Sequence, residues 1–154
     1  MISKLLKITA VLLALSFIAI QFSRPEFNNP PVIPGQRLED ITDVPDEIAG
    51  ILNRSCADCH SNETRYPWYS GIAPISWGMY DHIRLGREEL NFSVWGTYSE
   101  KRRVRKLEEM CEEVTEGNMP FYQYLWLQPG SNLSSVQKSA LCKWTETHIA
   151  EAKE

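Results

Sequence analysis

The pentapeptide Cys56-Ala57-Asp58-Cys59-His60 restricts this chain more than any other feature of its sequence. Two thiols separated by two residues, followed at once by an imidazole, match three points of one porphyrin: two vinyl groups and the iron. This spacing is the c-type haem attachment pattern, in which Cys56 and Cys59 form thioethers and His60 is the proximal iron ligand. We therefore expect one covalent haem c and a fold that closes around it.

Two other interpretations of the cysteines stay open on the residues alone. A thiol-disulfide redox site has the same Cys-x-x-Cys spacing, but it normally lies in a βαβ setting. A zinc site could be built from Cys56, Cys59, Cys111 and Cys142. Structural zinc usually draws on two close pairs, and Cys111 and Cys142 are far apart in the sequence. We favour covalent haem over both.

The amino terminus has the layout of an export segment. Lys4 and Lys7 precede an apolar run from Ile8 to Phe22, and no convincing small-residue cleavage site follows. We expect residues 1–24 to be an uncleaved, single-pass anchor in the inner membrane, with its basic end in the cytoplasm and the rest of the chain in the periplasm. Haem attachment of the c type occurs outside the bacterial cytoplasm, so motif and segment support one another.

The net charge of the chain indicates which kind of partner it can bind. The whole chain carries a formal charge of -4, and subtracting the +3 of Lys4, Lys7 and Arg24 leaves -7 on the remainder. An acidic body makes nucleic acid a poor partner and fits redox proteins better. Residues 25–45 are rich in proline and predict an extended linker, which leaves residues 46–154 as one haem-binding domain.

Helical signals dominate this domain. Apolar spacing predicts a short helix over residues 46–55 and a longer one over about 76–90. Ser99 and Gly117 bound an amphipathic helix, and the Ser134 to Gln137 capping box starts a last one. No strand alternation is present. We expect an all-α, cytochrome c-like domain with long ordered loops, preceded by the anchor helix.

We expect the sixth iron ligand to be the thioether of a methionine or the imidazole of a second histidine. Met119 lies in Gly117-Asn118-Met119-Pro120, a short loop after a helix like the sixth-ligand loop of class I cytochromes c. We predict Met119 as the distal ligand, with His82 as the alternative. His148 is expected to be an ordinary side chain.

From Cys56 onward the chain resembles the haem-binding domain family of bacterial single-haem proteins. The resemblance covers about residues 45–147. Its blocks are Cys56 to His60, Thr64 to Ser70, Ala73 to Trp77, His82, Gly86-Arg87, Asn91 to Trp95, Gly117 to Pro120, Tyr124 and Leu133-Ser134. It implies a helical haem pocket with His60 proximal and Met119 distal, and it specifies no substrate or partner. Gln128 stands where the family pattern often has His, which makes the pocket more dependent on Met119.

Other side chains are candidates for the pocket or for its support. Trp68 and Trp77 are expected to exclude water from the haem, and Arg65 and Arg87 to meet its propionates. Haem attachment does not need Cys111 and Cys142. Because each lies on or beside an apolar helix stripe in an oxidising compartment, we predict a disulfide between them.

A six-coordinate covalent haem on a membrane tether predicts a one-electron carrier that serves redox proteins in or near the membrane. The alternative is a haem-based sensor or ligand-binding module with a displaceable sixth ligand. A catalyst with its own substrate is not expected, since bacterial c-type peroxidases resemble two-haem proteins and one motif is present here.

Overall fold

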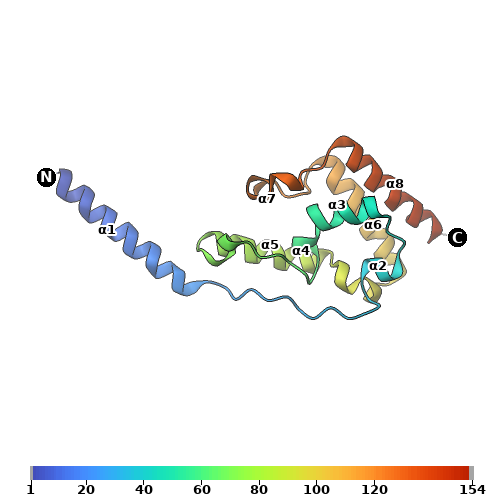
Figure 1. Ribbon diagram of the computed structural model, residues 1–154, viewed down its shortest axis with the longest axis horizontal. Coiled ribbons are helices and arrows are strands. Elements are labelled where there is room, and N and C mark those ends of the chain that lie inside the picture. Colours follow the sequence, from blue (N-terminus) through green and yellow to red (C-terminus); the bar gives the residue numbers. More distant parts are fainter. Residues whose placement is uncertain (1, 153–154) are drawn as a thin grey trace.

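The computed structural model describes residues 2–152, and within that range it contains helices and no strand. The all-α prediction is confirmed. α1 (Ile2–Ile20) projects away from the body and is followed by the 3-10 turn η1 (Gln21–Ser23), and none of their residues is buried (Figure 1). Together they are the one helical segment of the described chain that is long and apolar enough to cross a membrane.

One part of the body has a conventional core. α3 (Asp46–Ser55), α6 (Glu100–Glu116) and α8 (Ser135–Glu151) pack together, and α2 (Leu38–Ile41) and η3 (Phe92–Thr97) close this core at one side (Figure 1). Each helix buries one apolar face, as an amphipathic sequence requires. The core side chains are Leu38, Ile48, Ile51, Leu52, Phe92, Trp95, Tyr98, Leu107, Met110, Val114, Leu133, Leu141 and Trp144.

Local capping sets the ends of the two longest body helices. Ser99 accepts a hydrogen bond from the Arg102 amide at the start of α6, and Gly117 ends it in the left-handed region at φ 83°. Ser134 and Gln137 form the predicted capping box of α8. A disulfide joins Cys111 on α6 to Cys142 on α8, as expected. It closes the base of the loop that runs between the two helices.

The proline-rich segment does more than separate the anchor from the body. Leu38 of α2 is one of the most deeply buried side chains, and the Gly96 amide donates to the Gln36 carbonyl at 2.9 Å. From Gln36 onward this segment is therefore part of the fold, because it covers Trp95 and the rest of η3.

The remaining elements lie outside this core. α4 (Ala57–His60) packs on α5 (Ile75–Glu89), which also contacts η2 (Trp68–Gly71). α7 (Tyr122–Leu127) and η4 (Pro129–Ser131) lie on the loop between α6 and α8. α4 and α7 bury none of their residues, and α5 buries only Ser76 and Ile83.

Candidate functional site

The attachment motif sits at a break between two helices. Cys56 ends α3 and begins α4 with φ -127°, and its carbonyl accepts the amides of Cys59 at 3.1 Å and His60 at 2.9 Å. This tight turn gathers both thiols and the imidazole into one short element. α3 itself is set by apolar spacing and by the acidic pair Asp46 and Glu47 in its first turn.

His60 is held in one orientation by the end of α5. Its Nδ1 lies 2.9 Å from the Gly86 carbonyl oxygen and 3.0 Å from that of Leu90. A proton on Nδ1 is thus shared between two acceptors, which leaves Nε2 as the nitrogen with a lone pair. Burial lowers the pKa of His60, so the imidazole is neutral at physiological pH. A neutral ring with Nδ1 hydrogen-bonded to a carbonyl is the usual state of a metal-binding histidine.

Gly86 allows this arrangement. A Cβ on Gly86 would lie 2.8 Å from the Cys59 carbonyl oxygen, closer than Cβ atoms approach backbone atoms in proteins. The absence of a side chain therefore lets α5 reach α4 closely enough for its carbonyls to meet His60. In the sequence, Gly86 belongs to one block of the family resemblance, and no local pattern predicts this close approach.

The thiols of Cys56 and Cys59 are free and half-buried. Burial is the main cause that raises the pKa of Cys56 to about 12 and that of Cys59 to about 11. Reactive redox dithiols have lowered pKa values and lie in a βαβ setting, whereas these lie between helices. The four-cysteine zinc site is excluded because Cys111 and Cys142 are bonded to each other.

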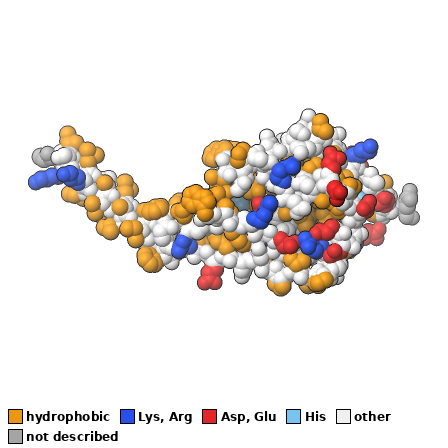
Figure 2. All heavy atoms as spheres, viewed as in Figure 1, with side chains coloured by type: hydrophobic (Ala, Val, Ile, Leu, Met, Phe, Trp, Pro, Cys, Tyr) orange, Lys and Arg blue, Asp and Glu red, His pale blue; other side chains and the backbone are white. Residues whose placement is uncertain are grey.

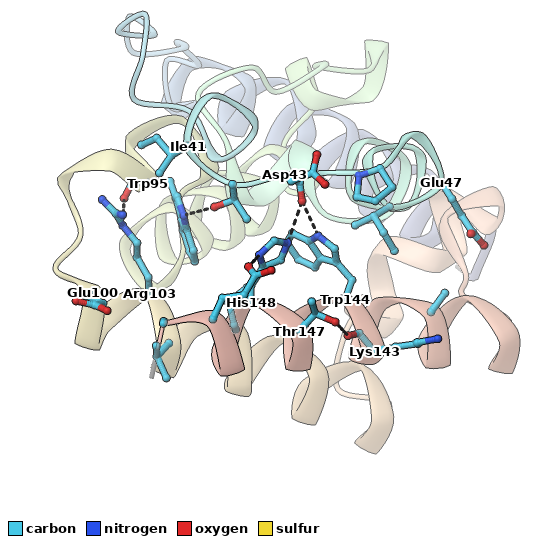
Figure 3. A pocket seen from close by; sticks show the side chains of 18 residues that line it. Ile41, Asp43, Glu47, Trp95, Glu100, Arg103, Lys143, Trp144, Thr147 and His148 are labelled. Atoms are coloured by element: carbon cyan, nitrogen blue, oxygen red, sulfur yellow. Dashed lines mark hydrogen bonds and ion pairs between the residues drawn. The ribbon is translucent and has the colours of Figure 1, made fainter. Parts of the chain in front are cut away.

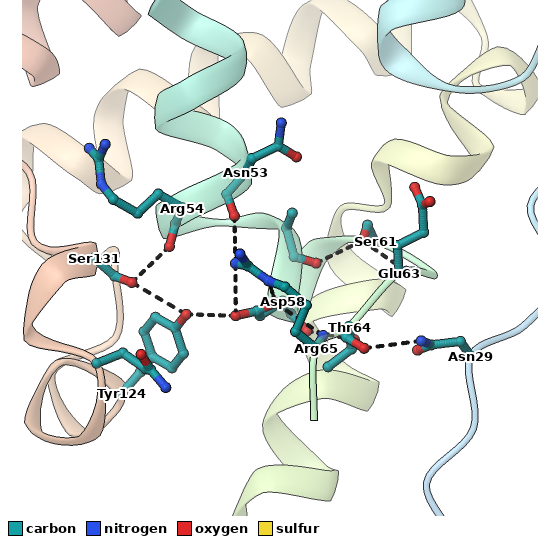
Figure 4. A network of polar contacts seen from close by, with 12 residues as sticks. Asn29, Asn53, Arg54, Asp58, Ser61, Glu63, Thr64, Arg65, Tyr124 and Ser131 are labelled. Carbon is teal, nitrogen blue, oxygen red and sulfur yellow. Dashed lines mark hydrogen bonds and ion pairs between the residues drawn. The ribbon is translucent and has the colours of Figure 1, made fainter. Parts of the chain in front are cut away.

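Asp58, inside the motif, anchors a polar network (Figure 4). Its carboxylate accepts Arg65 Nε at 2.9 Å and the Tyr124 hydroxyl at 2.9 Å. Ser131 donates to the Arg54 carbonyl at 2.7 Å beside it, so α7 and η4 are tied to both α3 and α4. Burial is the largest cause that raises the pKa of Tyr124 to about 12, which keeps this hydroxyl a donor. Asp58 therefore links the motif to α7, a contact that the sequence did not predict.

The two predicted arginines make their hydrogen bonds within the protein. Arg65 supports the motif through Asp58 and also donates to the Asn53 carbonyl at 2.8 Å. Arg87 donates to the Ser61 carbonyl at 2.8 Å and to Thr64 Oγ1 at 2.9 Å. Arg65 therefore holds the segment before His60, and Arg87 holds the segment after it.

The two predicted tryptophans lie at the outer corner of η2 and α5. Trp68 is 82% exposed and its ring meets that of Tyr69 edge-on at 5.8 Å. The Trp77 indole nitrogen donates to the Ser23 carbonyl at 3.0 Å, so this ring faces η1.

Both candidates for the sixth ligand lie near Phe121. Met119 lies two residues after Gly117, the α6 cap; its amide donates to the Glu113 carbonyl at 3.1 Å, and it precedes a buried proline, Pro120. His82 lies on α5 one turn before Gly86, its ring centroid is 4.4 Å from that of Phe121, and its Nδ1 is 2.6 Å from the Gly78 carbonyl oxygen. The fold thus brings the two candidates into one neighbourhood.

Large apolar side chains around these elements are exposed. They lie on η2, α5, α7 and the loop before α7: Trp68, Ile75, Leu85, Met119, Tyr122, Trp126 and Leu127. Figure 2 shows hydrophobic side chains gathered over α7 and over the η2 end of α5. Gln128 Nε2 donates to the Tyr69 hydroxyl at 3.2 Å and links the two sides. An oriented neutral imidazole, two free thiols and the exposed apolar side chains of α7 match the needs of a haem.

The chain also matches a known family. The model of the haem-binding domain family covers residues 15–147. The chain belongs to this family. The match begins inside α1, so the family's domain includes the end of that helix and the linker as well as the body. Comparisons with curated proteins and with solved structures found no match. Haem binding is thus a family property that this site's residues can serve.

A separate groove of about 780 Å³ lies between α8, α6 and the turn before α3 (Figure 3). No cysteine lines it, nor does His60. The Asp43 carbonyl accepts hydrogen bonds from the Trp144 indole at 2.9 Å and from His148 Nε2 at 3.0 Å. His148 therefore closes α8 against this turn, consistent with an ordinary structural role.

Proposed function

We propose that this protein is a membrane-tethered, single-haem electron carrier whose haem is attached covalently through Cys56 and Cys59. The observation that carries the proposal is His60, which follows two free thiols and is oriented by the Gly86 and Leu90 carbonyls. Membership of the haem-binding domain family supports haem as the cofactor, and the spacing of the thiols supports thioether attachment.

When bound, the haem supplies a reversible one-electron change at iron. The chain's own residues hold the geometry around that change. His60 stays neutral and oriented, Asp58 locks the motif to α7 through Tyr124, and Met119 is the proposed distal ligand. A rigid and largely apolar surround limits rearrangement when the charge changes, which suits electron transfer better than substrate turnover.

The membrane placement is part of the proposal. α1 and η1 satisfy the length and composition of a span. Lys4 and Lys7 on the amino-terminal side favour a cytoplasmic amino terminus, which leaves the haem domain in the periplasm. The proposed partners are redox proteins in or near the inner membrane.

Covalent attachment is tested by replacing the motif thiols. Protein matured in the periplasm should retain one haem per chain through acid-acetone extraction, and Cys56→Ala/Cys59→Ala should release it. Cys111→Ala/Cys142→Ala is the matched control, because it also removes two cysteines but should retain the haem. Haem that stays bound to the denatured motif variant would refute thioether attachment.

The alternative function is a sensor with a displaceable sixth ligand, and the exposure of Met119, 36%, is the observation that favours it. A carrier should resist carbon monoxide in the reduced wild type, whereas rapid and complete binding at neutral pH indicates a sensor. Met119→Ala should lower the reduction potential and open the site to carbon monoxide, while His82→Ala should change both only modestly. The reverse result makes His82 the distal ligand.

A further inference from the structure

The chain directly after α1, from Gln21 to Arg24, is not a free tether, because hydrogen bonds join it to the body. Gln21 Nε2 donates to the Ala73 carbonyl at 3.1 Å, and the Ala73 amide donates back to Gln21 Oε1 at 3.0 Å. The Arg24 guanidinium donates to the Gly71 carbonyl, and the Trp77 indole donates to the Ser23 carbonyl. The segment from 71 to 77 is therefore held where the apolar helix ends.

The part of the body at this junction is uncharged. No Asp, Glu, Lys or Arg occurs between Tyr66 and Tyr80, or between Gly117 and Gln137. The first segment runs from η2 into α5 and the second carries α7, and both lie at the end of the body that faces α1 (Figure 1). Charged side chains on the visible face lie mostly toward the other end (Figure 2).

We propose that Trp68, Ile75 and Trp77, here called the interface corner, rest in the interfacial layer of the bilayer that α1 crosses. This inference rests on the proposed membrane anchoring. Trp68 is 82%, Ile75 43% and Trp77 37% exposed. Tryptophan favours the membrane-water boundary because its ring is apolar and its N–H still needs a polar partner.

Lipid is the occupant that these observations favour. The hydrogen bonds of Gln21 and Trp77 hold the corner beside Phe22, the exposed aromatic residue in the last turn of the apolar segment. The absence of charge between Tyr66 and Tyr80 avoids the cost of placing ions near hydrocarbon. With its corner in the interface, the body has one orientation on the membrane and does not swing on a linker.

The test uses the full-length holoprotein in phosphatidylcholine vesicles with a photoreactive p-benzoylphenylalanine at one position per sample. Positions 68 and 75 probe the corner. Position 41 is the matched control, since Ile41 on α2 is 40% exposed, nearly the same as Ile75. Mass spectrometry should show several-fold more lipid adduct at 68 and 75 than at 41.

A second arm weakens the junction. Gln21→Ala should reduce the lipid adduct at position 68 several-fold, whereas Gln123→Ala, at an exposed position of α7, should leave it unchanged. The haem spectrum and retention after carbonate washing are recorded for every sample. The proposed position of the interface corner is wrong if positions 68 and 75 crosslink to haem or to the protein itself, or if positions 41 and 75 give equal lipid adducts. In that case, a chain that stays in the vesicles after carbonate washing still supports the membrane anchor. A chain released by carbonate refutes the anchoring and the corner with it.

Discussion

The two parts of the body treat apolar side chains in opposite ways. Around α6 and α8 such side chains close on each other, with Leu107 3% and Leu141 0% exposed. Around α4, α5 and α7 they remain open, and Trp126 is 69% exposed. We call these the closed half and the open half. In the closed half, protein packing alone removes the apolar side chains from water. In the open half they stay exposed, as expected where a bound group covers an apolar surface.

The largest expected effect is loss of structure in the open half when haem attachment fails. In Cys56→Ala/Cys59→Ala, backbone amides of α4, α5 and α7 should exchange rapidly while those of α6 and α8 stay protected. Hydrogen exchange with mass spectrometry measures both in one experiment. A uniform loss over the two halves, or none, would contradict the comparison.

Removing the disulfide should act on the closed half. The bridge spans 31 residues of sequence and closes the loop that carries Met119 and α7. Cys111→Ala/Cys142→Ala should lower the free energy of unfolding by about 2–4 kcal/mol, because the unfolded chain regains the entropy of that loop. Urea unfolding with and without reductant checks this: reductant should weaken the wild type and leave the variant unchanged. Equal stability of the oxidised wild type and the variant would show that the bridge adds nothing.

The junction between α4 and α5 can be tested with two glycines of one helix. Gly86→Ala places a Cβ 2.8 Å from the Cys59 carbonyl oxygen, so α5 must move and lengthen the bonds to His60. We expect a loss of about 1–3 kcal/mol and an altered haem spectrum. Gly78→Ala meets nothing within 4 Å and should stabilise the protein by about 0.5–1 kcal/mol. Thermal unfolding and absorption spectra compare them, and equal effects would disprove the close approach at Gly86.

The smallest effect is expected at the link between α7 and the motif. Tyr124→Phe removes the hydroxyl that donates to Asp58, at a cost of about 1 kcal/mol. Folding raises the pKa of Tyr124 from 10.0 to about 12, so its contribution is complete below pH 10 and is lost as the pH rises toward 12. Between pH 10 and 12, the free energy of unfolding should fall less steeply with pH for Tyr124→Phe than for the wild type. Tyr122→Phe, on the same helix but exposed, serves as the control and should follow the wild type.

Sequence reasoning was most successful where a signal and its effect are close in the chain. Ser99 caps α6 by bonding the amide of Arg102, and Ser134 and Gln137 bond each other's backbone across one turn. Such contacts depend on neighbouring residues alone, so composition and spacing suffice to predict them. The short helices α2 and α7 were not predicted, because each is too short for apolar periodicity to be recognised.

The proposed chemistry of the attachment motif rests on the sequence alone, since two thiols and an imidazole within five residues have the spacing of a c-type haem site. Only the tertiary structure decided what holds that motif. Gly86 and Leu90 orient His60 from α5, Arg65 and Tyr124 meet at Asp58, and Leu38 completes the core from within the linker. The physical reason is that these partners lie in different elements, and their pairing follows from how whole helices pack, which no local pattern contains.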